Sequence, residues 1–293
     1  MKQTRHLLIA LALGTMLTSC GASVSTATVT GPAAYVDTYI GSGGHGHVFV
    51  GASVPFGAIQ AGPQNIHKGW DWCSGYHHSD SIVIGFAHTH LSGTGCTDMG
   101  DVQIMPYTGE LRSKRGRQED IGGSCSSYYS HDNESVSPGY YSLKMDNGVR
   151  IEMTASTRTA LHRITYPEAE GRRLIINLEE GNGDGAYDTY LRQTDAHTVE
   201  GYRFSKGWGP HKVFFALTTD KPIRSLALFD ADTPSEGSEI RCKGAKGVLT
   251  FDDEKQVMVK VAISSVSSAN ALENLRTEIP GWEKSGLQIL HAE

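Results

Sequence analysis

YYSLKMDNGVRIEMTA, residues 140–155, has the pattern of a β-hairpin. Tyr140 to Met145 and Val149 to Ala155 are rich in the aromatic, β-branched and apolar residues that favour strands. Asp146-Asn147-Gly148 lies between them, and Asn-Gly can supply the positive φ angles that a tight turn requires. We therefore expect an antiparallel pair of strands here.

The segments after this hairpin have the same character and follow at short spacing. Each is β-branched or alternates apolar with polar residues, and each is bounded by Gly, Asp, Pro or Lys. These segments are residues 160–166, 173–178, 198–204, 212–218, 223–229, 239–242, 247–251 and 256–264. They recur with no fixed period, which argues against a solenoid or a propeller. The sequence predicts an all-β fold, a large antiparallel β-sandwich.

One helix is expected, near the end of the chain. Ser267, Ser268 and Asn270 can cap it, and Pro280-Gly281 would end it. Between them, Leu272, Leu275 and Ile279 form an apolar stripe at helical spacing. We therefore expect a sandwich domain over residues 34–266 and a short linker helix with a tail over residues 267–293.

The first residues have the pattern of an export signal. Lys2 and Arg5 precede a short apolar run, residues 7–17, which is too short to span a membrane. Leu17-Thr18-Ser19-Cys20 resembles the lipobox of bacterial lipoproteins, which implies a signal peptide over residues 1–19 and a lipid on Cys20. The alternative is an ordinary secretory signal. Residues 20–33 are mostly Ser, Thr, Ala and Gly, so we expect a flexible tether, and an exported lipoprotein anchored in the periplasm or at the cell surface.

Composition and charge exclude some functions. A net charge of -6 and a pI near 6.1 argue against nucleic-acid binding. The one basic cluster, residues 112–117, lacks interleaved aromatics and is interpreted as a solvated loop. The cysteines are too sparse for a disulfide framework, although Cys73 and Cys96 flank the same expected strand and could pair.

Residues 68–106 carry the strongest functional signal. They contain two tryptophans, four histidines and four aspartates. Ser81 to Leu91 is interpreted as a buried strand, which would place His88 and His90 on one face. Trp70 and Trp72 are also two residues apart on a strand-like run, and residues 92–95 form a glycine-rich loop. An aromatic wall beside a polar floor suits a sugar.

Each of these features has a simpler or competing interpretation. The two tryptophans could be core anchors, and His77-His78 could lie at the surface. His88 and His90 could bind zinc together with His45 or His47, although no fixed ligand spacing is present. Asp98 and Asp101 could be an acid and base pair, but such a loop more often caps a turn. The acidic loop over residues 179–184 could hold calcium but lacks the EF-hand order.

At GWDWCSGYHHSD (69–80) and HTHLSGTGC (88–96) the sequence resembles the N-terminal domain of glycoside hydrolase family 92, the exported calcium-dependent exo-α-mannosidases. The resemblance runs from Tyr35 to Trp282. It also includes YIGSGGHGHVFVGASVPFG (39–57), DVQIMP (101–106), SPGYYSL (137–143) and ISSVSSANALENLRTEIPGW (263–282).

This resemblance implies a large β-sandwich (supersandwich) whose helical linker leads into an (α/α) toroid domain. In the family the toroid supplies the calcium ligands and the carboxylates of inverting hydrolysis, so we assign no catalytic residue and no metal ligand to this chain. We expect it to be inactive alone, to need a toroid in cis or from a neighbouring chain, and to bind α-mannoside glycans. The residues that match the family's sugar pocket are Trp70, Asp71, Trp72, His88 and His90, and, less directly, Gly43, Gly44, His45 and Thr94.

Two other functions stay open at this point. One is a free-standing carbohydrate-binding module for mannose-type glycans. The other is a complete metal-dependent hydrolase that uses the histidines.

Overall fold

The computed structural model of the chain describes residues 31–118 and 120–282. The predicted signal peptide, Cys20, most of the tether and residues 283–293 of the tail lie outside them. Nearly all regular structure is antiparallel strand, in two large sheets and one small one. The predicted all-β sandwich is therefore confirmed. Among the described residues no helix combines the length and the apolar character needed to cross a membrane.

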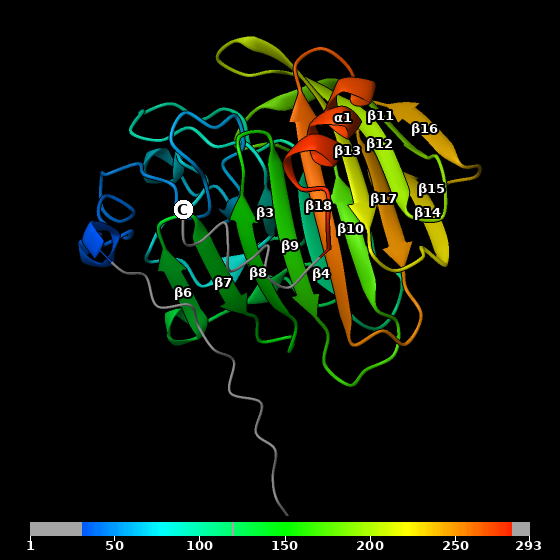
Figure 1. Cartoon of the computed structure of the whole chain (residues 1–293), viewed down its shortest axis with the longest axis horizontal. Helices are drawn as coiled ribbons and strands as arrows, with labels where there is room; N and C mark the ends of the chain where they lie inside the picture. Colours follow the sequence, from blue (N-terminus) through cyan, green and yellow to red (C-terminus); the bar gives the residue numbers. More distant parts are fainter. Residues whose placement is uncertain (1–30, 119, 283–293) are drawn as a thin grey trace, which may run out of the picture.

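The larger sheet has nine strands. In order across the sheet they are β16 (Glu239–Cys242), β11 (Gly185–Gln193), β12 (Thr198–Lys206), β13 (Pro210–Thr219), β18 (Gln256–Ser264), β9 (Thr159–Thr165), β8 (Arg150–Ala155), β7 (Tyr140–Lys144) and β6 (Glu134–Ser137). This sheet faces the viewer in Figure 1, and the second sheet lies behind it.

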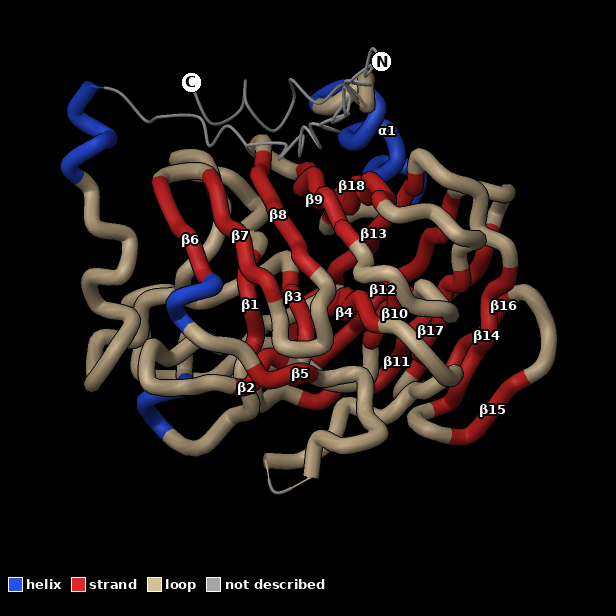
Figure 2. Tube along the Cα trace, turned by 90° about the horizontal axis from the view of Figure 1, so that it is seen from below, coloured by secondary structure: helices blue, strands red, loops and turns tan. Residues whose placement is uncertain are grey.

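The second sheet has seven strands. Their order is β1 (Gly62–Gln64), β3 (Gly85–Ala87), β4 (Gln103–Tyr107), β10 (Arg173–Asn177), β17 (Ala245–Thr250), β14 (Ser225–Asp230) and β15 (Thr233–Ser235). β2 (Ile82–Val83) and β5 (Ser127–Tyr128) form the small sheet. Figure 2 shows β6, β7 and β8 above β1, β3 and β4, so the two layers are stacked.

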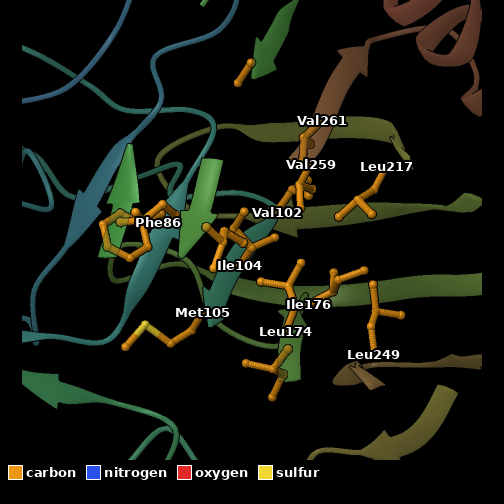
Figure 3. Packing of buried hydrophobic residues seen from close by; sticks show 14 of the residues in the cluster. Phe86, Val102, Ile104, Met105, Leu174, Ile176, Leu217, Leu249, Val259 and Val261 are labelled. Atoms are coloured by element: carbon orange, nitrogen blue, oxygen red, sulfur yellow. The ribbon is translucent and has the colours of Figure 1, made fainter. Parts of the chain in front are cut away.

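The core lies between these layers because alternate residues of each strand point inward. Val259 and Val261 of β18 belong to one buried cluster with Ile104 of β4 and Ile176 of β10 (Figure 3). Burial of this apolar cluster is the main force that holds the two sheets together.

The predicted hairpin is present as β7 and β8, but its turn differs from the expected one. Gly148 has φ 85°, whereas Asn147 is not among the residues with positive φ. The Asn147 side chain instead accepts a hydrogen bond from the amide of Val149 at 3.0 Å. The loop thus needs one left-handed residue, as three-residue hairpin loops do.

The expected strand over residues 81–91 was wrong as a single element. β2 pairs with β5, whereas β3 pairs with β1 and β4. Between them the amide of Ile84 donates to the carbonyl of Gln64. The chain therefore passes from one sheet to another within this apolar run. β11 was not predicted at all.

The helix α1 (Ser268–Glu278) agrees with the prediction and packs mainly on β18 and β13, on the outer face of the nine-stranded sheet (Figure 1). The Ser267 hydroxyl accepts the amide of Asn270 at 3.1 Å and so caps the first turn. Three short 3₁₀ turns complete the described structure: η1 (Gly31–Tyr35), η2 (Trp70–Trp72) and η3 (His131–Asn133).

Candidate functional site

An exposed tryptophan, Trp70, lies where three loops meet. Its side chain is 57% exposed, and its indole Nε1 donates to the carbonyl of Gly95 at 2.9 Å. The ring of His47 lies edge-on to the indole, with 4.2 Å between the ring centroids, and the centroid of the His45 ring lies 5.5 Å from that of the indole. The indole is therefore fixed in orientation while much of its surface stays open to solvent.

A carboxylate next to this indole joins the two histidines. Asp71 Oδ1 lies 2.5 Å from His45 Nδ1 and 3.6 Å from His47 Nε2. The hydrogen bond from His45 lowers the pKa of Asp71 below its usual value, so the group is a carboxylate at neutral pH. It offers acceptor oxygens to hydroxyl donors beside an aromatic surface.

Glycines allow the backbone to approach this indole. The amide of Gly93 donates to the carbonyl of His47 at 2.7 Å, which joins the two loops. A Cβ added to Gly95 would lie 2.9 Å from Trp70 Nε1, so a larger residue would displace the ring. Thr94 in the same loop is exposed, as are Gly43 and Gly44 beside His45. The structure thus brings Trp70, Asp71, His45, Gly43, Gly44 and Thr94 to one surface.

Trp72 does not share this face. The expected strand-like geometry was wrong, because residues 70–72 form a 3₁₀ turn, in which residues two apart point in different directions. Trp72 stacks on His77 at 4.4 Å, and its Nε1 donates to Asp80 Oδ2 at 2.9 Å. His77, expected at the surface, is buried by this stacking. A binding role for Trp72 stays a prediction.

His88 lies in the core between the sheets and is fully buried. Its Nδ1 lies 2.6 Å from the carbonyl oxygen of Val102, which can only accept, so Nδ1 carries the proton. Its Nε2 then accepts from Nε2 of His162 at 2.9 Å. Burial lowers the pKa of His88 to about 4 and that of His162 well below its usual value, so both rings are neutral.

His90 is also buried, but it lies at the edge of a cavity. Its Nδ1 is 2.8 Å from the carbonyl of Gln60, and its ring stacks on Phe49 at 5.2 Å. Burial lowers its pKa to about 4 as well. The cavity has a volume of about 680 Å³, and Phe49, Phe56 and Ser92 contribute to its walls. His90 thus lies at this cavity, whereas His88 lies in the core.

The four histidines of the zinc hypothesis are not brought together. His45 and His47 surround Trp70 and Asp71, whereas His88 and His90 bond to groups of the core. The four described cysteines are free thiols, and the possible pairing of Cys73 with Cys96 is not present.

Asp101 belongs to a buried ionic network that sequence reasoning did not identify. Arg203, on β12, is fully buried and donates to Asp101 at 2.6 Å and to Asp184 at 2.9 and 3.0 Å. His211 Nε2 lies 3.2 Å from Asp101, and this hydrogen bond raises the pKa of His211 to about 9. Asp98 accepts the amide of Met99 at 2.9 Å and so caps its own turn. Neither aspartate is free to act as an acid or a base.

Both charged loops are more involved in the fold than the sequence suggested. Arg115, from the basic segment, forms an ion pair with Glu180 of the acidic loop. Ser113 is buried and donates to Asp232 at 3.1 Å. The interpretation of residues 112–117 as a solvated loop was therefore wrong for Ser113 and Arg115, which bond to distant segments.

Known proteins share this fold. The profile of the glycosyl hydrolase family 92 N-terminal domain matches residues 35–264. An α-mannosidase of that family from Bacteroides thetaiotaomicron, solved with mannoimidazole, is 34% identical, with a TM-score of 0.84 over 88% of this chain and 36% of its own. An inverting mannosidase from the same organism is 24% identical, with a TM-score of 0.70 over 84% of this chain and 32% of its own, and supports the fold alone.

A curated relative, an uncharacterized secreted glycosidase from Arthroderma benhamiae, is 31% identical over 85% of this chain and 35% of its own length. The chain thus spans about a third of the length of such relatives. The match to the family profile covers most of the described residues, and the structural likeness extends over the same region. The chain therefore belongs to glycoside hydrolase family 92, whose N-terminal domain it contains.

Proposed function

We propose that this chain supplies the N-terminal half of the mannose pocket of an exported exo-α-mannosidase, in which a helical toroid domain supplies the catalytic groups. The observation that carries the proposal is the exposed, fixed indole of Trp70 beside the Asp71 carboxylate. A pyranose can stack its C–H face on the indole, while its hydroxyls donate to Asp71 and to backbone carbonyls of the neighbouring loops. Mannosidase activity in a relative of 34% identity supports the choice of sugar.

Catalysis needs a partner domain. Inverting hydrolysis requires an acid and a base about 6.5 to 9.5 Å apart across the sugar. Asp71 is bonded to His45, and Asp101 is held by Arg203, which leaves neither as a proton donor. The isolated chain should therefore bind an α-mannoside without cleaving it.

Calcium, which the family resemblance implies for the complete enzyme, does not fit the groups described here. Asp98, Asp184 and His211 lie close enough together to hold a metal ion. Arg203 already neutralises Asp184, and the raised pKa of His211 leaves its ring protonated at neutral pH. Calcium prefers six to eight oxygen ligands, so two cationic side chains in this cluster oppose it. We assign no step to calcium in this chain.

Export with a lipid on Cys20 is part of the same proposal. The sequence pattern of residues 1–20 supports it, and the curated relative is described as secreted. Mass spectrometry of the mature protein from the native host would detect the diacylglyceryl thioether. A chain that begins at another residue, without lipid, would contradict the anchor but not the export.

The central test is hydrolysis and binding of an aryl α-mannoside. The purified chain is assayed with and without calcium, and with and without the toroid domain of a relative. We expect no hydrolysis by the chain alone, measurable binding, and loss of that binding in Trp70→Ala. Hydrolysis by the chain alone would overturn the proposal that the toroid domain supplies the catalytic groups.

A free-standing binding module remains a second proposal, because Trp70 is accessible in the chain as described. The two proposals predict different effects of an added toroid domain on the affinity for α-mannosides. A binding module would hold α-mannosides with the same affinity whether or not a toroid domain is added, whereas half of a pocket would gain affinity when it is completed.

A further inference from the structure

A second exposed tryptophan, Trp208, lies at the turn between β12 and β13. Its side chain is 83% exposed, more than that of Trp70. It stands between Gly207 and Gly209 in a polar segment of the sequence, without neighbouring apolar residues in the turn. An exposed indole flanked by glycines presents a wide surface for a planar or ring-shaped ligand.

The turn that carries Trp208 is held by a side chain from a distant loop. Asp98 Oδ2 accepts the amide of Trp208 at 3.0 Å and that of Gly209 at 3.4 Å. A Cβ added to Gly207 would lie 2.3 Å from Asp98 Oδ1, so this approach requires glycine. The exposed ring therefore projects from a fixed backbone.

The base of the same hairpin is held by the buried ionic network. His211 follows the turn and bonds to Asp101, and Arg203 precedes it and joins Asp101 to Asp184. Removing one partner of such a buried ion pair leaves an uncompensated charge, so these pairs favour one arrangement of the hairpin. These ion pairs fix the backbone on both sides of the turn. The exposed Trp208 at the tip is therefore held in a position where it could contact a ligand.

The loop that holds Trp208 is also the loop that holds Trp70. Trp70 bonds to the carbonyl of Gly95, and Trp208 is held by Asp98. Three residues of chain span at most about 11 Å. The two anchoring residues, Gly95 and Asp98, therefore lie within about 11 Å of each other, and Ser92, Gly93 and Thr94 next to Gly95 are exposed.

We propose that Trp208 forms a second sugar-stacking position, which binds a further unit of an α-mannoside glycan whose terminal mannose lies on Trp70. This inference rests on the proposed function and deepens it, because it assigns an oligosaccharide rather than a single sugar to the site. The shared anchoring loop favours a glycan over a protein partner, because a single oligosaccharide could contact both indoles.

The test uses the full chain and two ligands, methyl α-mannoside and a panel of α-linked mannotrioses. Titration calorimetry gives the affinities of the wild type, Trp208→Ala, Trp208→Phe and Trp70→Ala. Tyr128→Ala is the matched control, because Tyr128 is an exposed aromatic, at 46%, on β5 in the small sheet. The four indole N–H signals of the chain, followed by NMR, report which tryptophans contact each ligand.

We expect Trp208→Ala to weaken the best mannotriose about fivefold, the worth of one exposed stacking contact, with the monosaccharide unaffected. Trp208→Phe should recover part of the loss, and the Trp208 indole signal should move only with the trisaccharides. Trp70→Ala should weaken both ligands.

The possible failures are distinguishable. If the wild type binds neither ligand, the mannoside site is overturned and this inference with it. If the wild type binds both and Trp208→Ala changes neither, or changes both equally, the second position alone is overturned. A Trp208→Ala chain that binds trisaccharides normally but no longer associates with a toroid domain would assign the indole to a protein contact and also overturn it.

Discussion

Replacing His88 by glutamine should weaken the acid dependence of the stability of this domain. His88 donates to Val102 and accepts from His162, and the second of these bonds needs a neutral ring. A glutamine at this position can donate through its amide nitrogen and accept through its oxygen, but it does not titrate. The variant therefore keeps the hydrogen bonds and removes one proton-binding group.

The magnitude follows from the pKa of His88, about 4 in the folded chain against 6.5 for an ordinary histidine. Because the folded pKa is the lower one, the unfolded chain binds the extra proton between these values. The stability is present above pH 6.5 and is lost as the pH falls toward 4. Each pH unit in this window removes about 1.4 kcal/mol, so His88 accounts for about 2 kcal/mol between pH 6.5 and 5.

Urea unfolding at pH 6.5, 6.0, 5.5 and 5.0 measures this difference. The free energy of unfolding of the wild type should fall more steeply than that of His88→Gln, by about 1.4 kcal/mol per pH unit. His78→Gln, which makes the same replacement at an exposed histidine, is the matched control. Parallel slopes for the wild type and His88→Gln would refute the neutral, buried histidine pair.

Three further outcomes follow from the site. The raised pKa of His211 predicts the opposite pH effect, because its contribution to stability is complete below pH 6.5 and is lost as the pH rises through about 9. In unfolding experiments at alkaline pH, His211→Gln should abolish this loss of stability. Arg203→Ala leaves two buried carboxylates without their partner and should lower the free energy of unfolding by about 3 to 5 kcal/mol, while the exposed Arg241→Ala should leave the urea midpoint almost unchanged. Gly95→Ala should displace the Trp70 indole and weaken methyl α-mannoside binding without a comparable loss of stability, and unchanged binding would contradict the assigned geometry.

Much of the fold could be predicted because local rules determine it. β7, β8 and α1 follow from turn residues, alternation and capping, all of which act within a few positions. β11 was missed because polar and charged residues such as Asp188 and Arg192 interrupt its apolar pattern. Its place in the sheet comes from pairing with β12 and β16, which the local sequence does not show.

The site was predicted in part, and the reasons differ from residue to residue. Trp70 was identified as part of an aromatic wall that suits a sugar, and Trp70 and Asp71 were both assigned by the resemblance to the family's sugar pocket. Gly69, with φ 129°, leads into a 3₁₀ turn and so prevents Trp72 from sharing the face of Trp70. The burial of His88 depends on His162, 74 positions away.

Trp208 was missed for a similar reason. The role proposed for it depends on the contact with Asp98, which is 110 positions away along the chain. Sequence alone presents Trp208 as one aromatic residue in a turn. Contacts between residues so far apart in the sequence depend on how the two sheets pack. Neither segment contains a local pattern that predicts them.

The end of α1 has a consequence for how a larger enzyme would be assembled. Glu278 accepts from Arg158 and Ser156, and Ile279 packs with Leu161 and Met258 on the outer face of the nine-stranded sheet. These hydrogen bonds and apolar contacts therefore hold the last turn of the helix in one orientation on the sandwich. The described chain thus stays in contact with the sandwich as far as Trp282, whose ring lies 4.1 Å from Lys260 Nζ. A second domain joined to this helix would therefore start from a fixed point on the first.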